Sequence, residues 1–171
     1  RLQAGRNVIT EKLKKITEEY EITRDELFFE ITETADGAED GLPGLVEQLR
    51  EKGFQIAMDD FGTGNSSLKV LQESHFDILK LDRYFVARIG DPKAEIILAS
   101  TIAMAGDLGL EVVAEGVETE EQIRFLLGHQ CHLAQGYYYS RPLTKEQYIK
   151  WQKVRNSSRA GGIFRERKLH I

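Results

Sequence analysis

Cysteine is nearly absent from this chain of 171 residues, because Cys131 is its only example. No internal disulfide can therefore form, which agrees with a reducing compartment such as the cytoplasm. The sequence also lacks a secretory signal and any apolar run long enough to cross a membrane. We expect a cytoplasmic segment without membrane contact, either of a cytoplasmic protein or of the cytoplasmic part of a membrane-bound one.

An excess of positive charge is missing as well. The chain has 23 lysines and arginines against 28 aspartates and glutamates, for a net charge of −5. This balance provides no basic field for a nucleic acid polymer and so excludes that class of partner, whereas a small anionic ligand can still bind through metal ions. The hydrophobic (41%) and charged (30%) fractions are those of an ordinary globular domain.

The chain also lacks an initiator methionine, since it begins Arg1-Leu2-Gln3. We interpret it as a piece of a larger protein. Its length is enough for one domain with a sizeable core, which we place at residues 1–155. Residues 156–171 are rich in Ser, Gly and Arg, which predicts a flexible basic tail.

Apolar patterns predict strands that alternate with helices along the whole chain. The strands are expected at 27–32, 55–60, 77–82, 110–116 and 132–138, and the helices at 7–20, 42–52, 66–73, 91–108, 119–128 and 144–154. Such alternation predicts an α/β fold with a parallel sheet. It fits an open doubly wound sheet, or a TIM-type (β/α) barrel of which this chain supplies about five of eight units.

Polar side chains gather at the carboxyl ends of these predicted strands. A barrel makes such ends converge, whereas an open sheet lets the outer ones diverge, so this set favours the barrel. In chain order the set is Glu30 and Glu33, Asp59 and Asp60, Lys80 and Asp82, Glu115 and Glu118, and Gln135.

Two adjacent acids end the second strand and precede a loop that contains Gly62 and Gly64. Two carboxylates about 4 Å apart repel by roughly 4 kcal/mol at an effective dielectric near 20. A divalent cation offsets this repulsion, because hard cations prefer oxygen ligands. Glu30 and Asp59 suit such an ion, and Asp60 can bridge to a second one, as in the metal pairs that act on phosphodiesters. The alternative is a solvated turn.

Lys80 lies within an apolar strand, where it can hold a catalytic water or stabilise developing charge. The alternative is an ion pair with Asp82 inside the barrel. Glu115 is either a ligand or an anchor for a neighbouring side chain. Glu118 either belongs to the site or serves only the start of the next helix, because acids favour helix N-termini.

Together these motifs resemble the EAL domain family, the bacterial phosphodiesterases that open cyclic di-GMP to linear pGpG. The resemblance implies a TIM-type barrel, a role in second-messenger control of biofilm and motility, and a homodimer. A sensor or GGDEF domain upstream is common in the family. The matching stretches are Glu30-Ile31-Thr32-Glu33-Thr34, Asp59-Asp60-Phe61-Gly62-Thr63-Gly64, Lys80-Leu81-Asp82, Ala114-Glu115-Gly116-Val117-Glu118-Thr119 and Gln135-Gly136-Tyr137.

The resemblance also implies roles for these residues, in a site with two Mg²⁺ or Mn²⁺ ions. Metal ligation falls to Glu30 and Asp59, with Asp60 at the second ion, and Lys80 positions or helps deprotonate the attacking water. Glu115 contacts the metal site. In the family the loop that corresponds to residues 61–68 couples the metal site to the dimer interface. The resemblance implies that six further residues support this loop or the substrate: Glu33, Gly62, Gly64, Asp82, Glu118 and Gln135.

The chain lacks the Glu-Ala-Leu signature of the family. It also lacks the strand with an asparagine that in the family normally precedes the segment matched by Arg1-Leu2-Gln3. Asn65 stands where the family often has tyrosine. The missing segments carry two metal ligands and part of the substrate pocket. We therefore expect that these 171 residues alone do not form a stable, active monomer. One alternative function is a non-catalytic module that binds cyclic di-GMP or a protein partner. The other is an unrelated metal-dependent phosphohydrolase.

Overall fold

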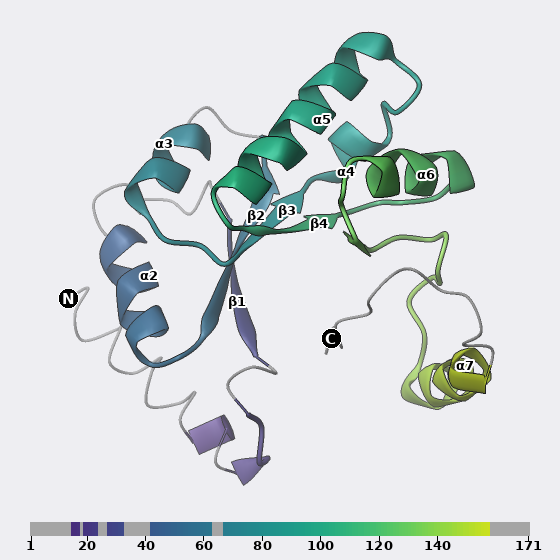
Figure 1. Cartoon of the computed structure of the whole chain (residues 1–171). Helices are drawn as coiled ribbons and strands as arrows, with labels where there is room; N and C mark the ends of the chain where they lie inside the picture. Colours follow the sequence, from purple (N-terminus) through teal and green to yellow (C-terminus); the bar gives the residue numbers. More distant parts are fainter. Residues whose placement is uncertain (1–14, 18, 24–26, 33–41, 63–66, 158–171) are drawn as a thin grey trace. The chain divides into compact units, whose positions relative to one another are not determined.

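A computed structural model describes residues 15–17, 19–23, 27–32, 42–62 and 67–157 (Figure 1). Its strands make one sheet in the order β1-β2-β3-β4-β5, and the β1–β2 and β4–β5 pairs are parallel. The elements are β1 (Phe28–Thr32), α2 (Leu42–Glu51), β2 (Gln55–Phe61), α3 (Ser67–Glu73), β3 (Ile78–Leu81), α4 (Arg83–Val86), α5 (Pro92–Asp107), β4 (Glu111–Ala114), α6 (Glu120–Gly128), β5 (Leu133–Ala134) and α7 (Lys145–Ser157).

The predicted alternation of strands and helices is confirmed. Most of the helix predicted at 7–20 lies outside the described residues, although 15–17 and 19 are helical. No helix within the described part of the chain is long and apolar enough to span a membrane.

The chain divides into two compact units. The first unit contains β1, α2, β2, α3 and most of β3, and the second contains α4 to α7, β5 and most of β4. In the first unit α2 packs on β2 (Figure 1). The helix buries Leu42, Val46 and Leu49, which repeat at helical spacing along one face. Ile56 and Leu79 complete this core and are fully buried.

Local capping rules explain where the helices of the second unit begin. The Asp91 carboxylate accepts hydrogen bonds from the backbone N–H groups of Lys93 (2.8 Å) and Ala94 (3.1 Å), at the start of α5. Thr119 and Gln122 form a capping box at the start of α6, in which each side chain bonds the other residue's backbone N–H. These exchanges satisfy backbone N–H groups that a helix start would otherwise leave unpaired.

The last strand is much shorter than the predicted range 132–138, since β5 has only two residues. Beyond it the chain turns, and Tyr137 and Tyr138 are 54% and 46% exposed, so they are not core side chains of a strand. The physical reason is a tertiary contact: Gly136 lies against the Val117 backbone, and the Tyr138 N–H donates to the Val117 carbonyl at 2.9 Å.

Cys131 is a buried free cysteine of the second unit. Burial raises the pKa of its thiol to about 11, so the side chain stays neutral at physiological pH. Because the thiolate is the reactive form of cysteine, a neutral buried thiol is unreactive, and Cys131 serves as a small packed side chain.

Replacement of Gly136 by alanine should destabilise the second unit. A Cβ atom there would lie 2.1 Å from the Val117 carbonyl oxygen and 2.3 Å from its nitrogen, and these are backbone atoms that cannot rotate away. We expect a loss of about 1–3 kcal/mol in the free energy of unfolding, measured by urea denaturation. Gly128→Ala is the matched control, because a Cβ at Gly128 meets no atom within 4 Å. Equal stability of the two variants would contradict this packing.

Candidate active site

The register of β1 and β2 places two of the predicted acids on the same face of the sheet. Glu30 lies opposite Ala57, and Thr32 lies opposite Asp59. Because side chains alternate along a strand, Glu30, Ala57 and Asp59 share one face, whereas Ile56 and Met58 point to the other. Ala57 is fully buried and small, which leaves space beside Glu30 for a side chain from the neighbouring strand.

Lys80 of β3 supplies that side chain. Its Nζ lies 2.8 Å from Glu30 Oε1 and 2.8 Å from Asp59 Oδ1. The Lys80 side chain is 7% exposed, against 17% for Asp59 and 39% for Glu30. An ammonium so deeply buried is stable only beside opposite charge, and two carboxylates provide it. Lys80 is therefore in an ion pair, as the alternative interpretation held, but these partners differ from the expected Asp82.

The Asp59 side chain meets Lys80 at a buried oxygen. Its Oδ1 atom is inaccessible to solvent, and the Lys80 ammonium lies 2.8 Å from it. A carboxylate oxygen removed from water is energetically costly unless a cation lies beside it, so this position suits a cation.

Backbone geometry separates Asp60 from Asp59. Asp60 has φ 53°, in the left-handed region that few non-glycine residues adopt, and Gly62 has φ 89°. Aspartate tolerates this region better than most residues, and the reversal interrupts strand alternation immediately after Asp59. Glu33 and Gly64 lie outside the described residues.

The donor set can be compared with the needs of Mg²⁺ or Mn²⁺. One cationic nitrogen already contacts Glu30 and Asp59, so these two carboxylates can meet at a single cation. Mg²⁺ is commonly bound by one or two carboxylates, with water and substrate phosphate as the other ligands. No group of three or more acid, histidine or cysteine side chains converges within the described part of the chain. The residues therefore fit one ion with an incomplete protein ligand set.

Four predicted site residues, Asp82, Glu115, Glu118 and Gln135, belong to the second unit. The Asp82 carboxylate accepts from the Tyr84 N–H at 2.8 Å and caps the short helix α4, which the sequence analysis did not predict. Glu115 follows β4, and its N–H donates to the Leu81 carbonyl at 3.0 Å. The Glu118 N–H donates to Gln122 Oε1 at 2.7 Å, as expected for a residue at the start of α6.

Gln135 directly follows β5. Its N–H donates to the Ala114 carbonyl at 2.8 Å, and its carbonyl accepts from the Val117 N–H at 3.0 Å. These bonds fix its backbone beside the Glu115–Val117 turn, and its side chain is exposed.

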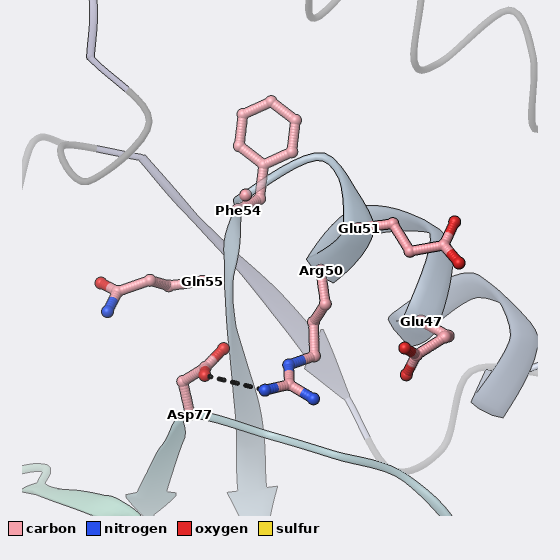
Figure 2. Close-up of a pocket in the computed structure, with 7 residues that line it drawn as sticks. Glu47, Arg50, Glu51, Phe54, Gln55 and Asp77 are labelled. Carbon is pink, nitrogen blue, oxygen red and sulfur yellow. Dashed lines mark ion pairs between the residues drawn. The ribbon is translucent and has the colours of Figure 1, made fainter.

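A polar hollow of about 410 Å³ lies at the other end of β2, where the strand begins (Figure 2). Sequence analysis gave no sign of it. Its Asp77 carboxylate lies 3.8 Å from the Arg50 guanidinium and accepts from the Ile56 N–H at 2.8 Å. This pairing ties α2 to the start of two strands and explains the hollow as a structural feature. The labelled lining residues are Glu47, Arg50, Glu51, Phe54, Gln55 and Asp77.

Comparison with known proteins now identifies the class. The family profile of the EAL domain matches residues 2–142, and the chain belongs to this family. A solved structure, the EAL domain of Mycobacterium smegmatis DcpA, matches with a TM-score of 0.77 at 37% sequence identity. The match covers 88% of this chain and 67% of the DcpA chain. The fold is therefore the TIM-type barrel class, represented here by its parallel five-stranded part.

Among curated relatives, the cyclic di-GMP phosphodiesterase NbdA of Pseudomonas aeruginosa is 46% identical over 126 residues, which are 73% of this chain and 15% of NbdA. RocR of the same organism, also named a cyclic di-GMP phosphodiesterase, is 37% identical over 150 residues, 86% of this chain and 38% of RocR. The chain thus spans well under half of the length of either relative.

Another solved relative was crystallised with metal. It is the manganese and cyclic di-GMP complex of Klebsiella pneumoniae BlrP1, with a TM-score of 0.72 at 34% identity; the match covers 78% of this chain and 34% of that one.

Proposed function

We propose that this chain belongs to an enzyme that hydrolyses cyclic di-GMP to linear pGpG with Mg²⁺ or Mn²⁺. The observation that carries this proposal is the contact of Lys80 with Glu30 and Asp59 on three neighbouring strands. Family membership and the names of the relatives support the substrate. The acids and the lysine together provide cation ligands and a fixed positive charge, which hydrolysis of a phosphodiester requires.

Glu30 and Asp59 would hold one ion, and Asp60 would serve a second. When bound, the metal lowers the pKa of a water molecule and offsets the charge on the phosphate. Lys80 contributes a donor and a positive charge that orient the attacking water and stabilise the charge that develops on phosphate oxygens. Its burial strengthens both effects, because charges interact more strongly away from bulk water.

The remaining predicted residues are proposed as supporting groups. Glu115 would contact the metal site from its turn after β4. Positioning of the substrate or of the loop after Asp60 is proposed for Glu33, Gly62, Gly64, Asp82, Glu118 and Gln135.

The test of this function is metal-dependent turnover by the natural protein that carries the chain. Chromatography should show conversion of cyclic di-GMP to pGpG with Mn²⁺ or Mg²⁺, loss of conversion after chelation with EDTA, and recovery when metal is restored. Binding of cyclic di-GMP without conversion would overturn the proposal in favour of a non-catalytic binding module.

We also propose a homodimer, in which a second copy covers exposed apolar side chains of α4 and α5. Tyr84 is 54% exposed, Ile96 68% and Ile97 47%, although the opposite face of α5 buries Leu98 and Ile102. Helices α4 and α5 contact each other, and exposed apolar side chains on neighbouring helices are typical of an interface. A cytoplasmic location, which the single cysteine supports, and an upstream sensor or GGDEF domain complete the proposed setting.

Replacement of Ile96 by aspartate should dissociate this dimer, because the interface would have to bury an unpaired carboxylate. We expect the dissociation constant to rise about a hundredfold, which is roughly 3 kcal/mol. Light scattering over a dilution series measures it. Val154→Asp is the control, since Val154 of α7 is 66% exposed and should leave the dimer unchanged. A wild-type protein that is monomeric while active would contradict the interface.

A further inference from the structure

Lys80 occupies the position where the proposed function requires a cation. Its Nζ contacts one oxygen of Glu30 and one of Asp59, each at 2.8 Å. The side chain is 7% exposed, so the ammonium is a fixed part of the interior and not a mobile surface charge. The chain itself therefore supplies positive charge to the position between the two carboxylates.

We propose that Lys80 is the built-in counter-ion of this carboxylate pair and competes with the divalent cation for it. The inference rests on the proposed function, because that function supplies the cation. A divalent ion and an ammonium that share the same oxygens repel each other, so binding requires Lys80 Nζ to withdraw from at least one of them. Lys80 thus sets a lower cation affinity than the two acids alone would give.

The burial of Asp59 adds a second consequence. Its Oδ1 atom is inaccessible to solvent, and the Lys80 ammonium at 2.8 Å compensates its charge there. Loss of Lys80 would leave two carboxylates facing each other in the metal-free protein, which is destabilising. A bound cation would remove this penalty. Lys80 therefore stabilises the metal-free form and opposes the metal-bound form.

The experiment titrates Mn²⁺ into the natural protein that carries this chain, after removal of metal, and compares it with its Lys80→Met variant. Calorimetry should give a dissociation constant for Mn²⁺ at least about tenfold lower in the variant, which is about 1.4 kcal/mol. The metal-free variant should melt at a lower temperature than wild type, and saturating Mn²⁺ should close the gap. Lys52→Met is the matched control, because Lys52 is exposed and its loss changes the net charge equally.

Unchanged or weaker Mn²⁺ binding by Lys80→Met would overturn the inference. If Lys80→Met does not fold without metal, Lys80→Gln replaces it, since the neutral amide keeps a hydrogen-bond donor without the positive charge, and the same criterion applies. The proposed function fails separately: a wild type that does not hydrolyse cyclic di-GMP, beside a variant that binds Mn²⁺ more tightly, refutes the activity and supports the competition. Normal hydrolysis by wild type beside unchanged Mn²⁺ binding by the variant does the reverse.

Discussion

The Asp59→Asn variant should hydrolyse cyclic di-GMP about 10²–10³ times more slowly than wild type, the usual cost of removing one charge-stabilising group from an active site. Asparagine keeps the shape of the side chain but removes the charge that faces Lys80 at 2.8 Å. This change removes one of the two carboxylates that contact the ammonium, and with it one ligand of the proposed metal site. The rate of pGpG formation under saturating substrate and Mn²⁺ measures the loss.

Asp107→Asn provides the matched control for this comparison, because Asp107 is an exposed acid at the end of α5. It changes net charge by the same amount, and its rate should equal that of wild type. If Asp59→Asn also retained the wild-type rate, Asp59 would have no place in the chemistry.

The second large effect concerns stability. Leu79→Ala should lower the free energy of unfolding by about 2–5 kcal/mol, because Leu79 is fully buried in β3 and the shorter side chain leaves a cavity. Leu79 precedes Lys80, so alternation directs the two side chains to opposite faces of the sheet. The cavity would therefore loosen the strand that positions the ammonium.

Urea denaturation measures this loss, and Val154→Ala serves as its control. Val154 is 66% exposed, so its truncation should change stability by no more than about 0.5 kcal/mol. A small effect at Leu79 would contradict tight packing of the face of β3 that carries it.

Local chemistry explains why most elements were predictable from the sequence. The starts of α5 and α6 follow from Asp91 and Thr119, whose side chains bond backbone groups only a few residues away. Gly53 has φ 82° and follows α2, as its conformational freedom predicts. Such interactions depend on sequence separations of one helical turn, which a reader of the sequence can see.

Tertiary contacts explain what was missed. The end of β5 depends on the fit of Gly136 against Val117, which are distant in the sequence. Helix α4 has four residues, too few to show a period, and its start is marked by Asp82, which had been interpreted as part of the strand.

In the candidate site, too, the residue types were predictable from the sequence, whereas their tertiary contacts were not. Glu30, Asp59 and Lys80 were chosen from the sequence because each polar side chain falls within or at the end of an apolar run. That Lys80 contacts both acids depends on the register between strands and on the small side chain of Ala57, and no sequence spacing contains this information. The left-handed backbone of Asp60 was likewise unpredictable, since aspartate adopts it only where its surroundings require it.

The central claim is that the protein hydrolyses cyclic di-GMP, and isotope incorporation tests it most directly. The natural protein that carries this chain is incubated with cyclic di-GMP and Mn²⁺ in water enriched in ¹⁸O, and the product is weighed by mass spectrometry. The account predicts linear pGpG with one solvent oxygen in its terminal phosphate, because water breaks one of the two phosphodiester bonds. Recovery of intact, unlabelled cyclic di-GMP from protein that demonstrably binds it would contradict the account.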